Sequence, residues 1–239
     1  MTPQHFGCAV LCCSGPSLAR FKPPSRRDAV RPYVVAVNGA VEYLRNKGPI
    51  DCIMIHERGA AIVFHSEIRM AMGQNPHALL VITDPVRKSE RLLDITCKRN
   101  FMVVSDNFGF SMIAPGLPAR RREVVTPPGL PPKYDIEGGN TCGALSLAIM
   151  AMEEGFGFEK IDVYGLDGYT PKGAYVNAPT EIDPWKAQAF NDRASECIAE
   201  ITKRCPETEF VWHSRPIHHT KDWRITFAPD VDQSLQCSA

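Results

Sequence analysis

The sequence of 239 residues lacks an excess of either charge, since Lys+Arg and Asp+Glu number 27 each. Proteins that bind nucleic acid through its phosphates usually carry a basic excess, so the composition leaves only a local basic patch for that function. The nine cysteines include no CxxC pair, whereas zinc sites usually need closely spaced ligand pairs. The composition therefore predicts neither a nucleic-acid-binding protein nor a structural zinc site.

Long apolar runs and targeting segments are also missing from the sequence. No apolar stretch approaches the ~18 residues that a membrane-spanning helix needs. Residues 1–6 carry no positive charge, and the apolar run before Ser14 is too short for a signal peptide. We therefore expect a cytoplasmic protein without a membrane span, in which most cysteines are buried as small hydrophobic residues.

What the sequence does have is ample apolar content, with 44% hydrophobic and 23% charged residues. This composition is typical of one globular domain and excludes a disordered, collagen-like or disulfide-dependent chain. Several short runs are apolar at consecutive positions, which favours strands buried on both faces of a parallel sheet. The strands expected on this basis are residues 8–13, 33–37, 52–55, 78–83, 101–105, 161–164 and 209–213.

Helical patterns lie between these strands. The expected helices are residues 40–46, 66–72, 89–99, 142–154 and 185–204. The alternation predicts a Rossmann-like α/β fold, with a mainly parallel sheet and helices on both faces, as a single domain over residues 1–229. Six prolines interrupt the pattern in residues 114–139, which we expect to be a lid-like insertion or a solvated connector. Residues 230–239 are expected to form a flexible tail.

Polar residues and glycines follow almost every expected strand. Ligands of open parallel sheets bind outside the carboxyl ends of the strands, so these residues are candidates for a site. The candidate nucleotide-binding residues are Ser14, Gly15, Pro16, Ser17, Asn38, Gly39, Thr141, Cys142 and Gly143. Neither G-x-G-x-x-G nor the Walker sequence is present. We predict that these residues and Asp167 converge, and that the strand order reverses near residues 8–13.

Acid–base residues occur at two further places. His213, His218 and His219 lie within the segment WHSRPIHH and are candidate catalytic bases, because histidine titrates near neutral pH. His56, Glu57 and Arg58 follow the third expected strand and form a second acid–base cluster. Asp167 is a candidate catalytic residue that binds a ribose hydroxyl or a metal, or else a capping residue of its turn. No metal site is predicted, because the paired histidines lack an acidic partner at helical spacing.

Three sequence blocks resemble known families. They are CCSGPSL, VVAVNGA and GGNTCGALSLAIMAMEEGFGFEKIDVYGLDGY, which fall within residues 9–40 and 138–169, about a quarter of the chain. The blocks resemble bacterial lipooligosaccharide sialyltransferases and a neighbouring superfamily of motility-associated glycosyltransferases and hydroxymethylpterin diphosphokinases. The resemblance implies a Rossmann-like fold in which Ser14–Ser17 and Asn38 approach the nucleotide of a cytidine-linked sugar. Ser14 departs from the family pattern, which has Asn at that position. The resemblance also implies a histidine base in the C-terminal half.

The expected function is therefore transfer of a sugar from a nucleotide-activated donor, with a cytidine nucleotide favoured. The acceptor is unknown and is a glycan, a protein or a nucleic-acid base. One alternative is a Mg²⁺-dependent diphosphokinase or nucleotidyl-type transferase, in which Asp84, Asp106 and Asp167 would hold the metal. Another is a nucleotide-binding module without catalysis. A cofactor, Mg²⁺, is implied only by the diphosphokinase or nucleotidyl-type transferase.

Overall fold

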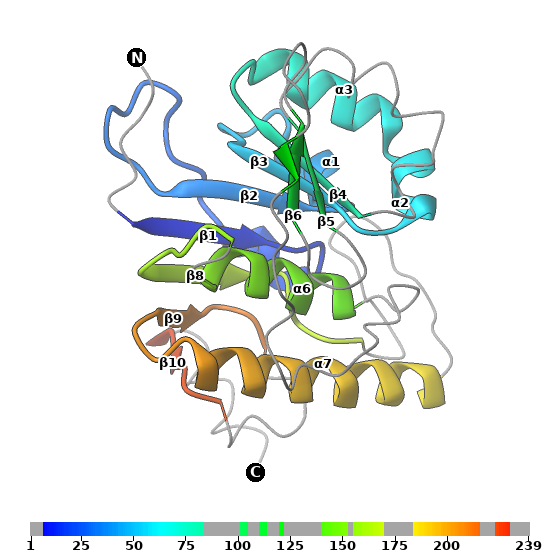
Figure 1. Cartoon of the computed structure of the whole chain (residues 1–239), viewed down its shortest axis with the longest axis vertical. Helices are drawn as coiled ribbons and strands as arrows, with labels where there is room; N and C mark the ends of the chain where they lie inside the picture. Colours follow the sequence, from blue (N-terminus) through cyan, green and yellow to red (C-terminus); the bar gives the residue numbers. More distant parts are fainter. Residues whose placement is uncertain are drawn as a thin grey trace.

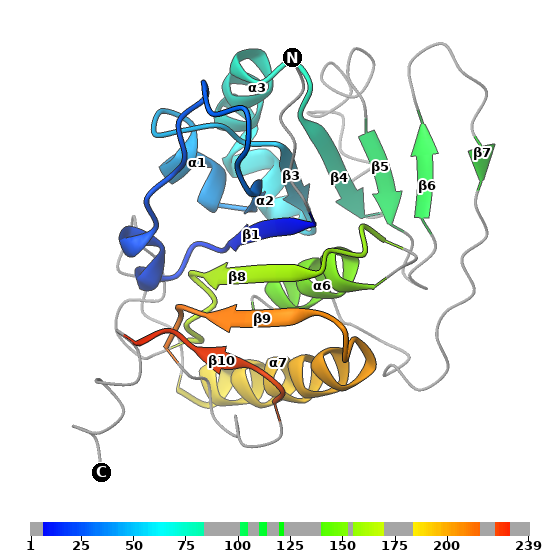
Figure 2. The same cartoon turned by 90° about the vertical axis from the view of Figure 1, so that its left-hand side faces the viewer.

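The computed structural model describes residues 7–83, 101–104, 110–113, 120–121, 140–152, 155–169, 184–215 and 223–229. Through them runs a ten-stranded sheet in the order β10-β9-β8-β1-β2-β3-β4-β5-β6-β7, with its ends at β10 and β7 (Figure 2). The strands are β1 (Cys8–Cys12), β2 (Tyr33–Val37), β3 (Cys52–Ile55), β4 (Leu79–Thr83), β5 (Phe101–Val104), β6 (Phe110–Ile113), β7 (Arg120–Arg121), β8 (Lys160–Tyr164), β9 (Glu209–Trp212) and β10 (Thr226–Phe227).

The strand order confirms the predicted α/β class and the reversal at β1. Every pairing from β10 to β5 is parallel, and only β6 and β7 pair in the antiparallel sense. The chain steps outward from β1 through β2, β3 and β4 to β5, and β8 then lies on the other side of β1. The connections that follow β1 and β8 therefore diverge, which is how doubly wound sheets form a ligand site.

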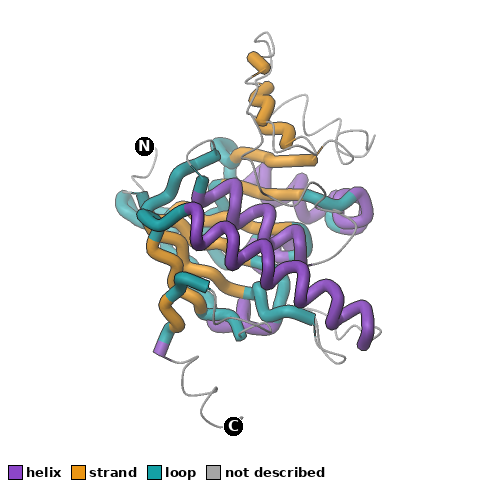
Figure 3. Tube along the Cα trace, turned by 60° about the horizontal axis from the view of Figure 1, so that its bottom comes forward, coloured by secondary structure: helices purple, strands orange, loops and turns teal. Residues whose placement is uncertain are grey.

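Both faces of the central strands are buried, which explains their uninterrupted apolar sequences. In β1, Ala9 and Leu11 belong to one hydrophobic core, whereas Val10 and Cys12 belong to the other. The first core contains α6 (Asn140–Ala151) and α7 (Pro184–Arg204), which lie side by side in Figure 3. The second contains η1 (Pro16–Arg20), α1 (Ala40–Leu44), α2 (Arg58–Val63) and α3 (His65–Gln74), part of which is seen beside the strands in Figure 1.

The two long helices differ in sequence because they differ in burial. The described side chains of α6 are all buried, since this helix packs between the sheet and α7. In α7, the residues at helical spacing Ala194, Cys197, Ile198 and Ile201 are buried, while Glu196 and Lys203 are exposed. A helix that is apolar all round is expected inside a fold, and an amphipathic helix at its surface. None of the helices in the described ranges has the length and apolarity that crossing a membrane requires.

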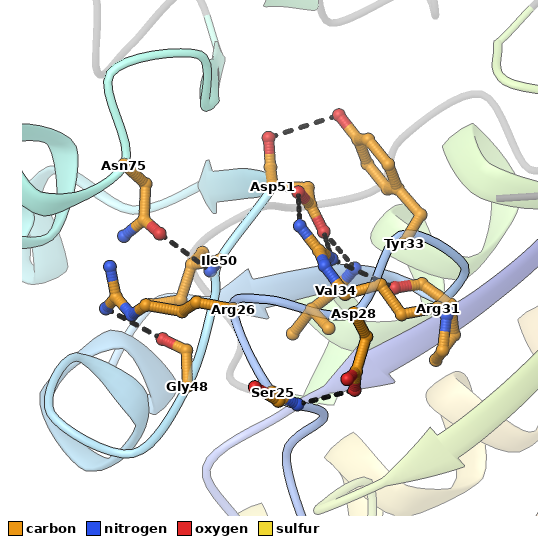
Figure 4. A network of polar contacts seen from close by, with 11 residues as sticks. Ser25, Arg26, Asp28, Arg31, Tyr33, Val34, Gly48, Ile50, Asp51 and Asn75 are labelled. Carbon is orange, nitrogen blue, oxygen red and sulfur yellow. Dashed lines mark hydrogen bonds and ion pairs between the residues drawn. The ribbon is translucent and has the colours of Figure 1, made fainter. Parts of the chain in front are cut away.

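The amino ends of β2 and β3 are held by a polar network (Figure 4). The buried Arg31 guanidinium donates to both carboxylate oxygens of Asp51, at 2.5 and 2.7 Å, and the Val34 amide donates to Asp51 Oδ2 at 2.9 Å. Asn75 accepts a hydrogen bond from the Ile50 amide at 3.2 Å. The polar side chains that hold the amino ends of these two strands are thus occupied by contacts within the protein.

The structure corrects the expected elements in a few places. The segment 114–139 was expected to be irregular, but Arg120 and Arg121 within it form β7. Two-residue strands such as β7 and β10 are held by backbone pairing and leave no side-chain pattern to detect. The short helix α2 and the strand β6 were not predicted either. The expected helix 89–99, the remainder of 114–139 and the tail 230–239 lie outside the described residues.

Candidate functional site

The turns that follow β1 and β8 are joined directly at the carboxyl edge of the sheet. The Cys13 amide donates to the Tyr164 carbonyl and the Gly15 amide to the Gly165 carbonyl, both at 2.8 Å. These bonds continue the parallel ladder beyond the last paired residues of the two strands. The first turn and the Gly-Leu-Asp-Gly turn, 150 residues apart in sequence, therefore lie side by side.

Glycines at this edge permit close packing of the protein against itself. A Cβ atom on Gly15 would lie 2.4 Å from the Gly165 carbonyl oxygen, and one on Gly165 would lie 1.9 Å from the Cys13 carbonyl oxygen. Gly165 also has a φ of +73°, which favours glycine. A Cβ on Gly143 would lie 2.5 Å from the Leu166 side chain, so α6 begins against the same turn. Gly15 and Gly143 are thus needed for internal packing, and their expected role toward a nucleotide stays a prediction.

Hydrogen bonds of Ser17 and Asp167 join the segments that follow β1, β8 and β9. The Ser17 hydroxyl accepts a hydrogen bond from the Gly165 amide at 2.8 Å and donates to Ser214 Oγ at 3.1 Å. The buried Asp167 carboxylate accepts from the Ser17 amide and from the Arg215 amide, both at 2.7 Å. These contacts give Ser17 and Asp167 a structural role at the ends of β1, β8 and β9. Their roles toward a nucleotide or in catalysis stay predictions.

A second polar cluster lies where β2, β3 and α6 meet. Asn38 has a φ of +46°, an unusual value for a residue other than glycine. Its side-chain oxygen accepts a hydrogen bond from the His56 amide at 3.1 Å. The Cys142 thiol donates to Glu57 Oε1 at 3.2 Å, and the Asn38 side chain lies close enough to the thiol to act on its pKa. Three residues that the sequence assigned separately to the nucleotide site and to the acid–base cluster are therefore in contact.

Burial shifts the pKa of each titratable group in this cluster. It raises the pKa of the Glu57 carboxyl, and it raises the pKa of the Cys142 thiol, on which the nearby Glu57 charge acts in the same direction. Burial also lowers the pKa of His56 to about 3. Ser146 gives its hydroxyl hydrogen to the Cys142 carbonyl, so its oxygen accepts from His56 Nε2 at 2.7 Å. His56 is thus a neutral, buried donor that joins β3 to α6.

The turn after β1 and the residues before α1 lie between the Ser17–Asp167 contacts and the cluster of Asn38, Glu57 and Cys142. A Cβ on Gly39 would lie 3.6 Å from the Ser14 Cβ and 2.9 Å from the Phe64 ring, so Asn38–Gly39 lies against the turn after β1. The half-buried Ser14 hydroxyl has no hydrogen-bond partner among the described residues and is not one of their buried unpaired atoms. Pro16 is exposed at the start of η1. Ser14 is therefore an accessible hydroxyl between the two clusters.

His213 lies directly after β9, which pairs with β8 on the side opposite to β1. β9 runs parallel to both of its neighbours, β8 and β10, in keeping with the expected mainly parallel sheet. His213 Nε2 lies 2.8 Å from Asp162 Oδ1, and the imidazole stacks on the Tyr164 ring with centroids 4.1 Å apart and planes at 6°. Sequence reasoning missed Asp162 and Tyr164, although in β8 they alternate with the apolar Ile161 and Val163. That alternation is the signal that could have identified a second, more polar face.

Other candidate residues are placed only in part. Arg58 begins α2 and is exposed, as is Arg215 after β9. Thr141 is the second residue of α6, which starts two residues earlier than the expected 142. His218, His219, Asp84 and Asp106 lie outside the described residues. Within the described part of the chain, no group of three or more His, Cys, Asp or Glu side chains is arranged to hold a metal ion.

Comparisons of the chain with protein-family models, with curated proteins and with solved structures gave no match. The fold class therefore rests on the sheet itself, whose parallel strands are covered by helices on both faces. Function has to be inferred from the chemistry of the carboxyl edge. The relevant features there are the joined turns of β1 and β8, the cluster at the start of α6 and the His213–Asp162 pair.

Proposed function

We propose that the protein is a glycosyltransferase that binds a nucleotide-activated sugar at the carboxyl edge of its sheet, with a cytidine nucleotide favoured. The observation that carries this proposal is the meeting of the β1 and β8 turns where the strand order reverses. In doubly wound α/β proteins, ligands bind at this reversal, outside the carboxyl ends of the strands. The resemblance of the three sequence blocks to sialyltransferases supports the choice of substrate class.

The phosphates of the donor would lie between the first turn and the start of α6. A helix of 12 residues presents unpaired amides and a positive dipole end at its N-terminus, and α6 begins beside Cys13 through Gly143. The accessible Ser14 hydroxyl adds a donor from the turn after β1. Asn38 and Glu57 lie next to Cys142 and would face the ribose. The side chains in this arrangement, Ser14, Asn38 and Glu57, are half-buried, whereas Ser17 and Asp167 are buried and bonded within the protein.

His213 would act as the base. In the transfer step, the acceptor hydroxyl gives its proton to the imidazole while its oxygen forms a bond to the anomeric carbon. The bond from that carbon to the phosphate oxygen breaks, and its electron pair leaves with the nucleotide. The exposed Arg215, two residues from His213, would stabilise the charge that develops on the leaving phosphate. His218 and His219 stay alternative candidates for the base.

Thermal unfolding with CMP, CDP, UDP, GDP and ATP, each with and without Mg²⁺, tests the proposal. A ligand at 100 times its dissociation constant stabilises a protein by about 2.7 kcal/mol, which is readily measured. We expect CMP or CDP to stabilise the protein without metal. Loss of one hydrogen bond to a charged phosphate in Ser14→Ala should weaken that binding ~10- to 100-fold. Ser66→Ala, at an exposed serine of α3, is the matched control and should bind as the wild type does.

Other outcomes of this screen, combined with an assay for CMP release from CMP-linked sugars, would contradict the proposal. Stabilisation by ATP that depends on Mg²⁺ would contradict the glycosyltransferase and favour the diphosphokinase. Binding of CMP without release of CMP from any CMP-linked sugar would favour a non-catalytic nucleotide-binding module. If no nucleotide raises the unfolding temperature, the protein does not bind nucleotides at this edge.

A further inference from the structure

The face of β8 and β9 that is turned away from α6 and α7 carries polar residues. Ile161, Val163, Phe210 and Trp212 pack into the core that contains the two long helices. Their neighbours in sequence project from the opposite face because side chains alternate along a strand. These neighbours are Lys160, Asp162, Tyr164, Glu209, Val211 and His213, which are half-buried except for the exposed Glu209.

Two side-chain pairs on this face differ in geometry. Lys160 and Glu209 are register partners, and their charged atoms are 2.8 Å apart. Both side chains are well exposed, so this pair is screened by solvent as surface salt bridges are and contributes little to stability. Asp162 has Val211 as its register partner, yet its carboxylate reaches diagonally to His213 beyond the end of β9. The second pair therefore sits at the carboxyl edge of the sheet and is less exposed, with side chains 18% and 27% accessible.

The Asp162 contact fixes which nitrogen of His213 carries the proton. An ionised carboxylate only accepts hydrogen bonds, so Nε2 at 2.8 Å must be the donor. In the neutral imidazole, Nδ1 then has the free lone pair. Nδ1 has no hydrogen-bond partner in the described ranges and is not among their buried unpaired atoms. The nitrogen that can accept a proton is therefore the one that an incoming molecule can reach.

Further contacts hold the ring in place. Tyr164 stacks flat against the imidazole, and Phe21 packs on Tyr164 with ring centroids 5.1 Å apart. The His213 amide donates to the Val163 carbonyl at 2.9 Å, and the His213 carbonyl accepts from the Arg20 guanidinium. The backbone, the ring plane and one ring nitrogen of His213 are thus all fixed. Such preorganisation is what a proton acceptor in an active site needs.

We propose that Asp162 is the positioning residue of the His213 base. It holds the imidazole in the form protonated at Nε2 and stabilises the imidazolium that forms when Nδ1 takes the proton of the acceptor hydroxyl. A carboxylate behind a catalytic histidine acts in this way in hydrolases, where it orients the ring without accepting the proton itself. The reaction in which Asp162 takes part rests on the proposed function. The hydrogen bond by which Asp162 orients the His213 ring does not.

Long-range ¹H–¹⁵N NMR of the histidine side chains tests the Asp162–His213 hydrogen bond without any substrate. We expect the neutral His213 ring to be protonated at Nε2 in the wild type, with the signals assigned by their loss in His213→Gln. Asp162→Asn keeps the shape but can donate from its amide, so the preference for the Nε2–H form should be lost. Glu209→Gln breaks the neighbouring Lys160 pair on the same two strands and should leave the His213 signals unchanged.

Turnover separates the positioning role from a structural one. With a CMP-linked sugar as donor, Asp162→Asn should lower kcat ~100-fold while KM changes by less than about twofold. Glu209→Gln should keep full kcat, and thermal unfolding should show that both variants fold. A wild-type ring protonated at Nδ1 would overturn the proposal, as would an active Asp162→Asn beside an inactive His213→Gln. If His213→Gln itself keeps full turnover, the base of the proposed function is wrong, and Asp162 positions no catalytic group.

Discussion

Two histidines near the same edge of the sheet have opposite surroundings. His56 is completely buried and donates from Nε2 to Ser146, a residue 90 positions away in sequence. His213 is half-buried, donates from Nε2 to Asp162 and keeps Nδ1 accessible. Both histidines follow apolar strands, so the sequence could name them as candidates but could not distinguish them. Only the partners brought by the fold separate a structural histidine from a candidate base.

The burial of His56 predicts how stability depends on pH. The pKa of His56 is lowered from 6.5 to about 3 in the folded protein. As pH falls below about 6.5, the unfolded chain binds a proton that the folded protein does not, so the free energy of unfolding falls between about pH 6.5 and 3. The slope from this one group reaches ~1.4 kcal/mol per pH unit. His56→Gln keeps a donor for Ser146 but cannot titrate, and urea unfolding at several pH values should show a smaller loss.

Glu57 supplies the control for this measurement because its effect has the opposite sign. Burial raises the pKa of the Glu57 carboxyl, so the folded protein takes up this proton before the unfolded chain does. Its contribution to the free energy of unfolding therefore rises as pH falls through the raised pKa. Glu57→Gln should make the loss of stability in acid steeper, whereas His56→Gln should make it shallower. Equal slopes in the wild type and His56→Gln would contradict the buried neutral state of His56.

At the scale of elements, the turns at the carboxyl edge owe their shape to glycines with no room for a side chain. Gly165 combines a positive φ with a neighbouring carbonyl oxygen 1.9 Å from where a Cβ would lie. Gly165→Ala should therefore lower the free energy of unfolding by at least about 2 kcal/mol. Gly73 in α3 has open space around it, and Gly73→Ala should stabilise the protein by about 0.5–1 kcal/mol. Urea unfolding compares the two, and a loss of similar size at both positions would refute the close packing of the turns.

The elements that sequence could predict are those whose burial is two-sided or periodic. β1, β2 and β3 are apolar at every position because both faces are covered, and α7 shows its buried stripe at helical spacing. α2 spans six residues and β10 two, too few for a period to be recognised. The sequence placed the candidate residues at strand ends. It could not show that Ser17 and Asp167 bind each other, because they lie 150 positions apart in sequence.

For the molecule as a whole, the two edges of the sheet have different chemistry. At the amino edge, Arg31 and Asp51 form a nearly buried ion pair, with side chains 5% and 14% exposed. At the carboxyl edge, Ser14, Arg215 and Nδ1 of His213 are accessible groups around turns that are otherwise internally bonded. This asymmetry follows from the parallel strands, which gather all their carboxyl ends at one edge. We propose that this carboxyl edge binds the nucleotide.

Amide hydrogen exchange of the intact protein with and without saturating CMP tests this claim most directly. We expect slower exchange in residues 13–17, 38–42, 141–146 and 165–169, which surround the proposed phosphate and ribose positions. Exchange in residues 25–34 and 48–52, at the amino edge, should be unchanged by CMP and serves as the internal control. Protection confined to the amino edge, or no protection anywhere at millimolar CMP, would contradict a nucleotide site at the carboxyl edge of β1 and β8.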